Sequence, residues 1–237
     1  MEFTEWLLNE EKKKKFVPEI LTPAQKASRQ RKKNNGVATL AKNMSRLQKR
    51  VSSDLSSSDE EIKLTAAAVK TMLDTSERVG NKASAKSGHH GVTGLKRNHI
   101  KKGGGSIKLK YTGKSGMKHE KELKDKRVLK AMEAGTDNNL FKTQAGKEVT
   151  NTMVNSYLKE FGITSKDIRG YNANKFMSQK LSGLGGGDEK ERKDKFLRAL
   201  EEIAEKVGHT PSMLRNSYLN PSMEDDYVKR GVVKKRH

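Results

Sequence analysis

Four short segments of the chain carry side chains that could act together on a phosphodiester bond. Breaking such a bond by transesterification without a metal requires a nucleophile, cations beside the charge that develops on phosphorus, and an acid for the leaving oxygen. Arginine suits the second role because its planar guanidinium meets two phosphate oxygens at once and stays charged, and lysine or histidine suits the third. In chain order the segments are Arg78-Val79-Gly80-Asn81, Tyr111-Thr112-Gly113-Lys114, Lys166 to Ala173 with Arg169 inside, and Gly208-His209-Thr210-Pro211 with Tyr218 nine residues after His209.

Each of these side chains, taken alone, also has an ordinary structural explanation. A single surface arginine such as Arg78 is usually a solvated charge, and Lys114 is one lysine in a turn. His209 follows a helix end, and Tyr218 stands at helical spacing from Leu214, as a core aromatic would. Their occurrence in this order, in a strongly basic chain, favours the chemical explanation.

The charge balance predicts a polyanionic partner. The chain has 50 Lys and Arg against 29 Asp and Glu, a formal net charge of +21. Such a charge repels itself unless a polyanion neutralises it, and contacts to phosphate drive nucleic-acid binding through counterion release. We therefore expect a nucleic acid as the partner. We expect no membrane, because no apolar run approaches the length that spans a bilayer.

The absence of cysteine and the sequence around the histidines exclude other kinds of site. Without cysteine there is no disulfide, no thiol nucleophile and no Cys-ligated zinc, so an intracellular protein is expected. The four histidines between positions 89 and 119 have no Asp or Glu at ligand spacing, which disfavours zinc. Gly113-Lys114-Ser115 resembles part of a nucleotide-binding loop, but the first glycine of that pattern would fall on Lys108.

A small antiparallel sheet is predicted between Gly94 and Leu123. The run from Ile107 to Tyr111 alternates apolar and basic residues with a period of two, as a half-buried strand does. Gly113 to Gly116 is a tight-turn sequence, and a further strand is expected from His119 to Leu123. This arrangement places Lys114 at the tip of a hairpin.

Helices are predicted on both sides of this sheet, so the expected fold class is mainly α with a small antiparallel β-sheet (α+β). Phe196 to Val207 forms the clearest amphipathic stripe, and Gly208 should end that helix. Thr210 and Pro211 should begin another helix, which runs to about Leu219 and carries Tyr218. Helix starts are further predicted at Ser57 with Glu60 in a capping box, at Thr150, and at Ser165 before Arg169.

The composition divides the chain into three parts. Residues 1–37 are interpreted as a basic N-terminal arm or remnant, 38–230 as the catalytic domain and 231–237 as a basic tail. For the basic residues after position 21, a solvated linker and a DNA-contacting arm both stay open. Within the domain, the Gly-rich and then charged stretch 182–195 is predicted to be a flexible insertion.

The order and spacing of the four segments resemble the catalytic domain of type IB DNA topoisomerases, including the compact viral and bacterial enzymes. The resemblance covers roughly residues 38 to 230. The matching positions are Arg78 for the first catalytic arginine, Lys114 for the hairpin lysine, Arg169 with Tyr171-Asn172-Ala173 for the second arginine, His209 for the histidine, and Tyr218 with Leu219-Asn220-Pro221 for the nucleophile.

The resemblance implies a type IB topoisomerase or tyrosine recombinase-like catalytic domain and a reaction. Tyr218 would attack the scissile phosphate, giving a 3′-phosphotyrosyl bond and a free 5′ hydroxyl. Arg78, Arg169 and His209 would stabilise the pentacoordinate charge, and Lys114 would protonate the leaving oxygen. The nicked end would swivel, supercoils would relax, and the reverse reaction would reseal the strand.

No ATP or other cofactor is expected to be required, with Mg²⁺ at most a stimulant. The residues further expected to contact DNA are Asn81, Lys96, Arg97, Lys110 and Lys118.

The sequence departs from the family pattern in two places. Gly170 stands where a threonine is usual. The N-terminal sheet domain that closes the family's clamp around the duplex is not evident in residues 1–50, so we expect a minimal or truncated form. A separate N-terminal domain or a partner chain is the expected source of a clamp, and the chain is expected to be monomeric on DNA. We expect it to be associated with DNA in a nucleus, a nucleoid or a viral particle or factory.

Two alternatives remain. A tyrosine recombinase or integrase uses a similar residue set and the same interval from histidine to tyrosine. Recombinases usually have H-x-x-R at the second arginine, whereas Lys166 occupies that position here, which favours the topoisomerase. A non-catalytic basic DNA-binding protein would account for the net charge of +21 but not for the order of the motifs.

Overall fold

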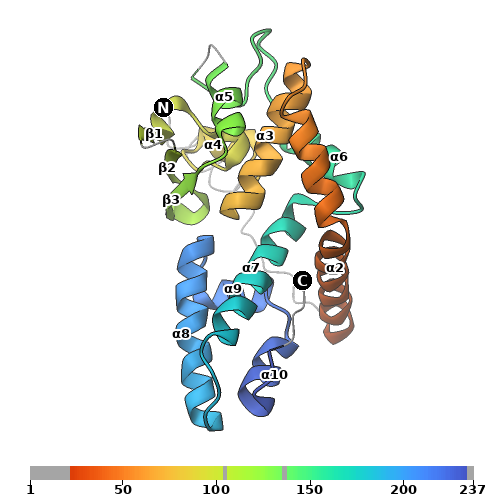
Figure 1. The fold of residues 1–237 in the computed structure, drawn as a ribbon, viewed down its shortest axis with the longest axis vertical. Coiled ribbons are helices and arrows are strands. Elements are labelled where there is room, and N and C mark those ends of the chain that lie inside the picture. The colour runs from red at the N-terminus through yellow and green to blue at the C-terminus, as the bar shows by residue number, and fades with distance from the viewer. Residues whose placement is uncertain (1–21, 104–105, 135–137, 234–237) are drawn as a thin grey trace, which may run out of the picture. The chain divides into compact units, whose positions relative to one another are not determined.

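The computed structural model describes residues 22–103, 106–134 and 138–233. The chain divides after Lys32 into two units, and the fold and the site belong to the second, residues 33–237. The helices and strands (Figure 1) are α2 (Pro23–Asp54), α3 (Glu60–Thr75), α4 (Lys82–Lys86), β1 (Ile100–Gly103), β2 (Ser106–Thr112), β3 (Lys118–Leu123), α5 (Lys126–Ala134), α6 (Asn151–Lys159), α7 (Ser165–Ser182), α8 (Glu189–Val207), α9 (Pro211–Ser217) and α10 (Ser222–Arg230).

The three strands form one antiparallel sheet in the order β1-β2-β3. Leu109 of β2 pairs with Ile100 of β1 and with Lys121 of β3. Along β2 the side chains alternate between buried and exposed, with Ile107, Leu109 and Tyr111 facing the core. A short turn at Lys114–Gly116 joins β2 to β3. The predicted fold class, mainly α with a small antiparallel sheet, is confirmed.

Two hydrophobic cores hold the helices in place. The first joins α2, α3, the sheet, α5 and α6, through fully buried side chains such as Leu47, Met72 and Leu158. The second joins α8, α9 and α10. Helix α7 contributes to both, and in Figure 1 it runs between the two groups of helices. Its first half is buried almost without interruption from Ile168 to Asn174, which a surface helix would not be.

The helix starts agree only in part with the sequence patterns. Thr150 and Thr210 cap α6 and α9, because each hydroxyl accepts a hydrogen bond from a backbone N–H three residues later. For α3 the predicted cap at Ser57 is wrong: Asp59 caps the helix and accepts from the N–H groups of Glu61 and Ile62. For α7 the cap is Thr164 rather than Ser165, which is the first helical residue.

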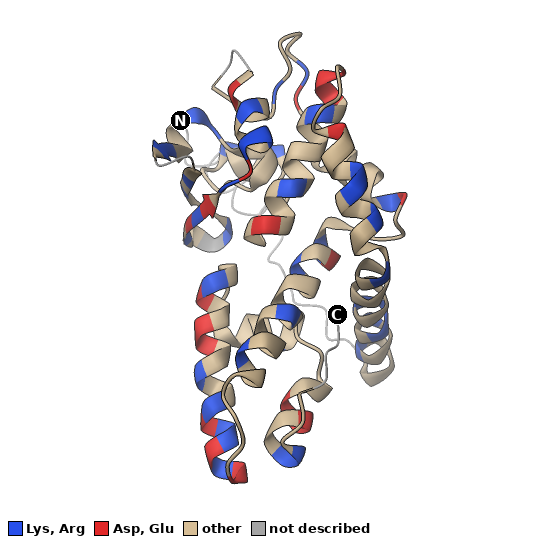
Figure 2. Ribbon diagram, in the orientation of Figure 1, with Lys and Arg blue, Asp and Glu red and all other residues tan. Residues whose placement is uncertain are grey.

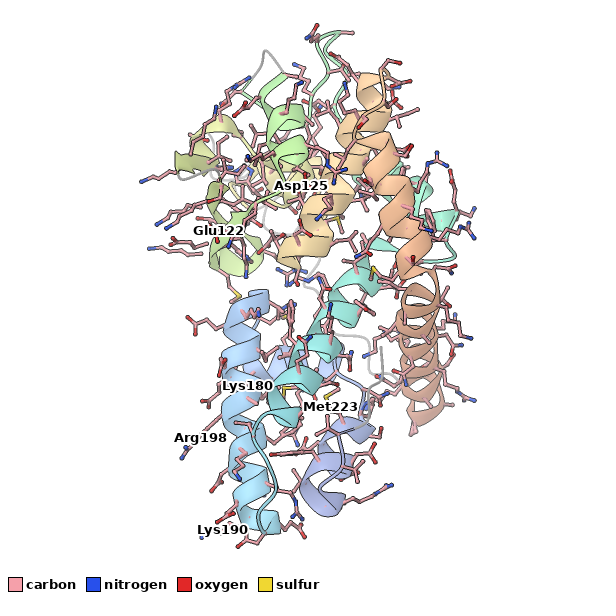
Figure 3. All side chains as sticks on the ribbon, viewed as in Figure 1. Glu122, Asp125, Lys180, Lys190, Arg198 and Met223 are labelled. Atoms are coloured by element: carbon pink, nitrogen blue, oxygen red, sulfur yellow. The ribbon has the colours of Figure 1, made fainter. Side chains whose placement is uncertain are left out.

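The prediction of a flexible insertion at 182–195 is wrong in its second half. Asp188 accepts a hydrogen bond from the N–H of Glu191 and starts α8 at Glu189. Lysine, arginine and acidic residues alternate along this helix, as Figure 2 shows, while Phe196 and later apolar residues face the second core. Exposed charges such as Lys190 and Arg198 extend away from the helix (Figure 3). The charge run is therefore the solvated face of an amphipathic helix.

The ends of the predicted domain division are only partly covered. Residues 1–21 of the predicted arm and 234–237 of the predicted tail lie outside the described residues. Residues 23–37 of the arm are helical and belong to α2. The division into arm, catalytic domain and tail stays a prediction. In the described part of the chain, no helix combines the length and the apolar character that a membrane crossing requires.

We expect Leu200→Ala to destabilise the fold far more than Leu197→Ala. Both leucines lie on α8, but Leu200 is 3% exposed in the second core whereas Leu197 is 38% exposed. Truncating a buried leucine costs ~2–5 kcal/mol through lost transfer energy and a residual cavity. The exposed change should cost under ~1 kcal/mol, as most surface substitutions do. Urea unfolding measures both, and equal losses would contradict the placement of α8 on the core.

Candidate active site

The structure brings the predicted catalytic side chains together. Arg78, Lys114, Arg169 and Tyr218 line one pocket of about 410 Å³. His209 adjoins it through contacts with both arginines. These residues come from the end of α3, the turn between β2 and β3, the first half of α7 and the segment from α8 to the end of α9. Their roles in a reaction stay predictions.

His209 lies between the two arginines. Its Nε2 is 2.6 Å from Nη2 of Arg169, and its Nδ1 is 3.3 Å from Nη2 of Arg78 and 3.2 Å from Sδ of Met213. Arginine can only donate, and a neutral imidazole accepts at one nitrogen. The shorter contact assigns the acceptor to Nε2. The hydrogen is then on Nδ1, where it faces the sulfur of Met213.

The positive charges around His209 keep its ring neutral. Burial, followed by the charges of Arg169 and Arg78, lowers the pKa of His209 to about 3. Burial and the charge of Arg78 likewise lower the pKa of Arg169. Concentrating cations in a buried place is unfavourable unless an anion joins them. The site is therefore electrostatically suited to receive a phosphate.

Arg169 has hydrogen-bond donors that nothing in the described chain satisfies. The residue is 3% exposed, and its Nη2 donates to the carbonyl of Val207 at 3.0 Å. Its Nε and Nη1 are buried and have no partner among the described residues. A buried unpaired donor costs ~1–3 kcal/mol, and more when it is charged. An anionic oxygen bound beside Arg169 would remove that cost.

Tyr218 is placed beside His209 and Arg169. The rings of Tyr218 and His209 have centroids 4.4 Å apart, and the Arg169 guanidinium carbon is 5.6 Å from the centre of the tyrosine ring. The prediction that Tyr218 lies within a helix running to Leu219 is wrong. Helix α9 ends at Ser217, and Tyr218 is the residue that caps it, with φ −128° and ψ −36°.

Two side chains from other helices hold the turn that carries Tyr218. Asn174 of α7 donates from Nδ2 to the carbonyl of Tyr218 at 2.9 Å, and its Oδ1 accepts from the N–H of Asn220 at 2.8 Å. Lys33 of α2 donates from Nζ to the carbonyls of Asn216 and Ser217, both at 3.2 Å. These carbonyls are the exposed end of α9, which favours a cation. Neither residue was predicted from the sequence to belong to the site, because no local pattern marks either of them.

Helix α7 also fixes the segment that leads to Arg78. Asn172 donates from Nδ2 to the carbonyl of Leu73 at 2.9 Å and to Oγ of Ser76 at 3.0 Å. Asn172 belongs to the sequence that carries the family resemblance, so a signal for it was present. Gly170, which replaces the usual threonine, has a packing reason. A Cβ at this position would stand 2.9 Å from Cγ2 of Val37 on α2, so a larger residue would push the two helices apart.

The predicted DNA-contacting residues fall into two groups. Asn81 lines the pocket and caps α4 by accepting from the N–H of Ser84. Asn81 and Lys96 also line a neighbouring pocket. Arg97, Lys110 and Lys118 are exposed and line neither pocket, and Lys110 forms an ion pair with Glu120 at 2.9 Å. Contact of all five with DNA stays a prediction.

We expect the DNA-free protein to lose stability as the pH falls from about 7 to 5. His209 has an ordinary pKa of 6.5 when unfolded and one of about 3 when folded. Below pH 6.5, His209 therefore binds a proton in the unfolded chain but not in the folded chain. The free energy of unfolding falls until the pH reaches the folded pKa. His99, with its pKa lowered to about 4 by burial and by His90, acts in the same direction.

His209→Gln should flatten this fall, because one of the titrating groups is gone. The slope of unfolding free energy against pH should decrease by at most ~1.4 kcal/mol per pH unit, the value for one proton. Denaturant unfolding at half-unit steps between pH 7 and 5 measures it, above the range in which carboxylates titrate. An unchanged slope in the variant would show that folding does not lower the pKa of His209.

Comparison with known proteins identifies the family of the chain. A family model described as the catalytic core of eukaryotic DNA topoisomerase I matches residues 22–235. The chain is also 28% identical over 132 residues to the DNA topoisomerase I of monkeypox virus and, with the same figures, to the DNA topoisomerase 1B of vaccinia virus strain Copenhagen. The aligned part is 54% of this chain and 42% of either relative, so the chain spans less than half of the length of the curated relatives it matches.

Among solved structures, the chain is similar to the XerH site-specific recombinase bound to its difH substrate. The post-cleavage complex gives a TM-score of 0.48 at 14% identity, covering 78% of this chain and 49% of that one. The pre-cleavage complex gives a TM-score of 0.46 at 15% identity, covering 76% and 51%.

The family model extends over nearly the whole chain and includes every residue of the site, from Arg78 to Tyr218. This match confirms the resemblance seen in the sequence. The chain therefore belongs to the family of the DNA topoisomerase I catalytic core.

Proposed function

We propose that this chain cleaves and rejoins one strand of duplex DNA as a type IB topoisomerase does, with Tyr218 as the nucleophile. One observation carries the proposal: Tyr218 lies beside a buried arginine that has a neutral histidine as its neighbour and two donor nitrogens without a partner among the described residues. A phosphate placed there would meet donors that are already oriented, and orienting charge before the reaction is a large source of rate acceleration.

The proposed reaction has the following steps. The Tyr218 oxygen attacks phosphorus and loses its proton to solvent, while the bond from phosphorus to the 5′ oxygen breaks. Arg78, Arg169 and His209 stabilise the charge on the non-bridging oxygens. Lys114, exposed on its turn, gives a proton to the departing 5′ oxygen. The free end rotates about the intact strand, and the reverse attack by the 5′ hydroxyl restores the phosphodiester.

Such a cycle conserves the energy of the phosphodiester bond in the phosphotyrosine. No ATP is therefore required, and side chains supply the cations that a metal would otherwise provide. Mg²⁺ acts at most as a stimulant. The substrate is double-stranded DNA, which is consistent with the net charge of +21, and the protein acts inside cells wherever its DNA is. It acts as a monomer on DNA, with any clamp provided by a separate N-terminal domain or a partner chain.

We expect Tyr218→Phe to abolish the covalent DNA complex while leaving DNA affinity within a few-fold of the unmodified protein, because only the hydroxyl is lost. Tyr227→Phe is the matched control, since Tyr227 is buried on α10 and its hydroxyl donates to the carbonyl of Gly185. The unmodified chain and the control should both form the complex and relax plasmid DNA in EDTA without ATP.

Denaturing gels of protease-treated, end-labelled DNA measure the complex. A protein–DNA adduct formed by Tyr218→Phe would place the nucleophile elsewhere. Absence of any adduct or relaxation by the unmodified chain, in EDTA or with Mg²⁺ and ATP, would reject the proposed function itself.

A second test assigns the proton donor. Lys114→Ala should cleave ordinary DNA ~100–10,000-fold more slowly, the usual contribution of a general acid. Replacing the bridging 5′ oxygen by sulfur gives a leaving group that needs no proton, so Lys114→Ala should cleave that substrate nearly as fast as the unmodified protein does. Arg169→Ala is the comparison, and it should stay slow because the charge on phosphorus develops in both substrates.

Single-turnover cleavage of both substrates by each variant gives the four rates that are needed. If Lys114→Ala is equally slow on both substrates, Lys114 is not the acid. His209 and Lys110 are then the next side chains to test.

A further inference from the structure

A buried carboxylate lies directly behind the site, and the proposed reaction does not use it. Glu77 is 1% exposed. Its Oε2 accepts a hydrogen bond from the Tyr111 hydroxyl at 2.6 Å, and its Oε1 is 2.8 Å from Nδ1 of His119. The rings of Tyr111 and His119 are stacked, with centroids 5.1 Å apart and planes 8° from parallel. Glu77, Tyr111 and His119 are referred to below as the buried cluster.

The surroundings of Glu77 keep it ionised. Burial by itself would raise the pKa of Glu77, but the hydrogen bonds and charges from His119, Tyr111 and Lys121 outweigh burial and lower it. The ammonium of Lys121 is 3.8 Å from Oε1. The negative charge in turn favours the charged form of Arg169. Glu77 is thus an anion set among the cations of the site, and buried charges are retained at low cost only when they are paired in this way.

Two members of the buried cluster, Glu77 and His119, are next to the backbone of proposed catalytic residues, and Tyr111 contacts both of them. Glu77 directly precedes Arg78. The His119 ring packs between two glycines, Gly113 and Gly208, which directly precede Lys114 and His209. A Cβ added at Gly113 would stand 2.4 Å from Nε2 of His119, and one at Gly208 would stand 2.5 Å from its Cε1.

These two glycines have different reasons to be glycine. Gly208 has φ +69°, the left-handed conformation that ends α8, so backbone geometry alone would select glycine there. Gly113 has φ −96°, which any residue adopts, so only the space taken by the His119 ring excludes a side chain. The close approach at Gly113 shows that the base of the Lys114 turn rests directly on His119.

We propose that Glu77, Tyr111 and His119 are positioning residues that fix Arg78, Lys114 and His209 relative to one another for the bond-breaking step. This inference rests on the proposed function. The buried cluster links the end of α3 to strands β2 and β3 and, through the His119 ring, to the end of α8. It does not line the pocket, so it acts on the geometry of the pocket rather than on DNA directly.

The consequence is a separation between binding and cleavage. DNA affinity comes from many phosphate contacts and should survive a change behind the site. Cleavage requires the reacting groups within a fraction of an ångström, and a displacement of about 1 Å can cost ~100-fold in rate. Variants of the buried cluster should therefore bind DNA normally and cleave it slowly.

The experiment compares Glu77→Gln, Tyr111→Phe and His119→Phe in the full chain. Each change keeps the shape of the side chain approximately and removes a charge or a hydrogen bond. Glu122→Gln is the matched control, because Glu122 is an exposed glutamate on β3, the strand of His119 (Figure 3).

We expect Glu77→Gln and His119→Phe to cleave ~100-fold more slowly in single turnover, with affinity for uncleaved DNA changed less than ~3-fold. Tyr111→Phe should fall between them and the control.

The double variant Glu77→Gln with His119→Phe distinguishes positioning from general damage. If the two residues act through one hydrogen bond, the double variant should be no slower than the slower single variant. Multiplied losses, or wild-type cleavage rates in folded single variants, would overturn the proposal. Affinity that falls in parallel with the cleavage rate would also overturn it.

Thermal unfolding shows which variants fold. If Glu77→Gln does not fold, Tyr111→Phe decides the outcome, because it removes one hydroxyl and keeps the stacked ring. Failure of the proposed function gives a different result: the unmodified chain and Glu122→Gln would then form no covalent complex at all.

Discussion

The burial of helix α7 on both sides is the constraint on which the site depends. Between Ile168 and Asn174 this helix packs into one hydrophobic core with its first half and enters the other with Ala173 and the residues after it. Polar side chains on such a segment must find partners, because solvent is absent. Asn172 binds the segment before Arg78, Asn174 binds the turn of Tyr218, and Arg169 binds the carbonyl before Gly208. Satisfying the polar groups of one buried helix thus brings distant parts of the chain to one place.

The site is cationic, so the repulsion among its charges must be reduced for the chain to fold. Arg169 is repelled by Arg78, Lys121 is repelled by Arg169, and burial adds to the cost of the charges on Arg169 and Lys121. Two features offset this: the imidazole of His209 stays neutral, and the carboxylate of Glu77 lies behind the arginines. The remaining imbalance appears at Arg169, whose buried Nε and Nη1 have no partner among the described residues. Preorganised sites are commonly less favourable in free energy before their ligand binds.

Several elements followed from local sequence and others did not. The alternation from Ile107 to Tyr111 predicted β2, and Thr150 and Thr210 predicted two helix starts, because these signals depend on neighbours within four residues. The charge run after Asp188 was misinterpreted as flexible, since a solvated helix face and an unstructured segment have similar compositions. Tyr218 was placed inside a helix that in fact ends one residue earlier, because a hydrogen bond from Asn174, 44 residues away, holds the turn.

By itself, the sequence determined which residue types were present, their order and the positive charge. These were enough to identify the family and to predict the five side chains that share the site, because the resemblance rests on motifs of a few residues each. Only the tertiary structure decided how His209 lies between two arginines, why Gly113 and Gly170 are glycines, and that Lys33 and Glu77 belong to the surroundings of the site. Except for the contact of Gly113 with His119 across the hairpin, each of these facts is a contact between residues remote in the chain. Such contacts arise from how helices pack, and packing leaves no periodic pattern in the sequence around one residue.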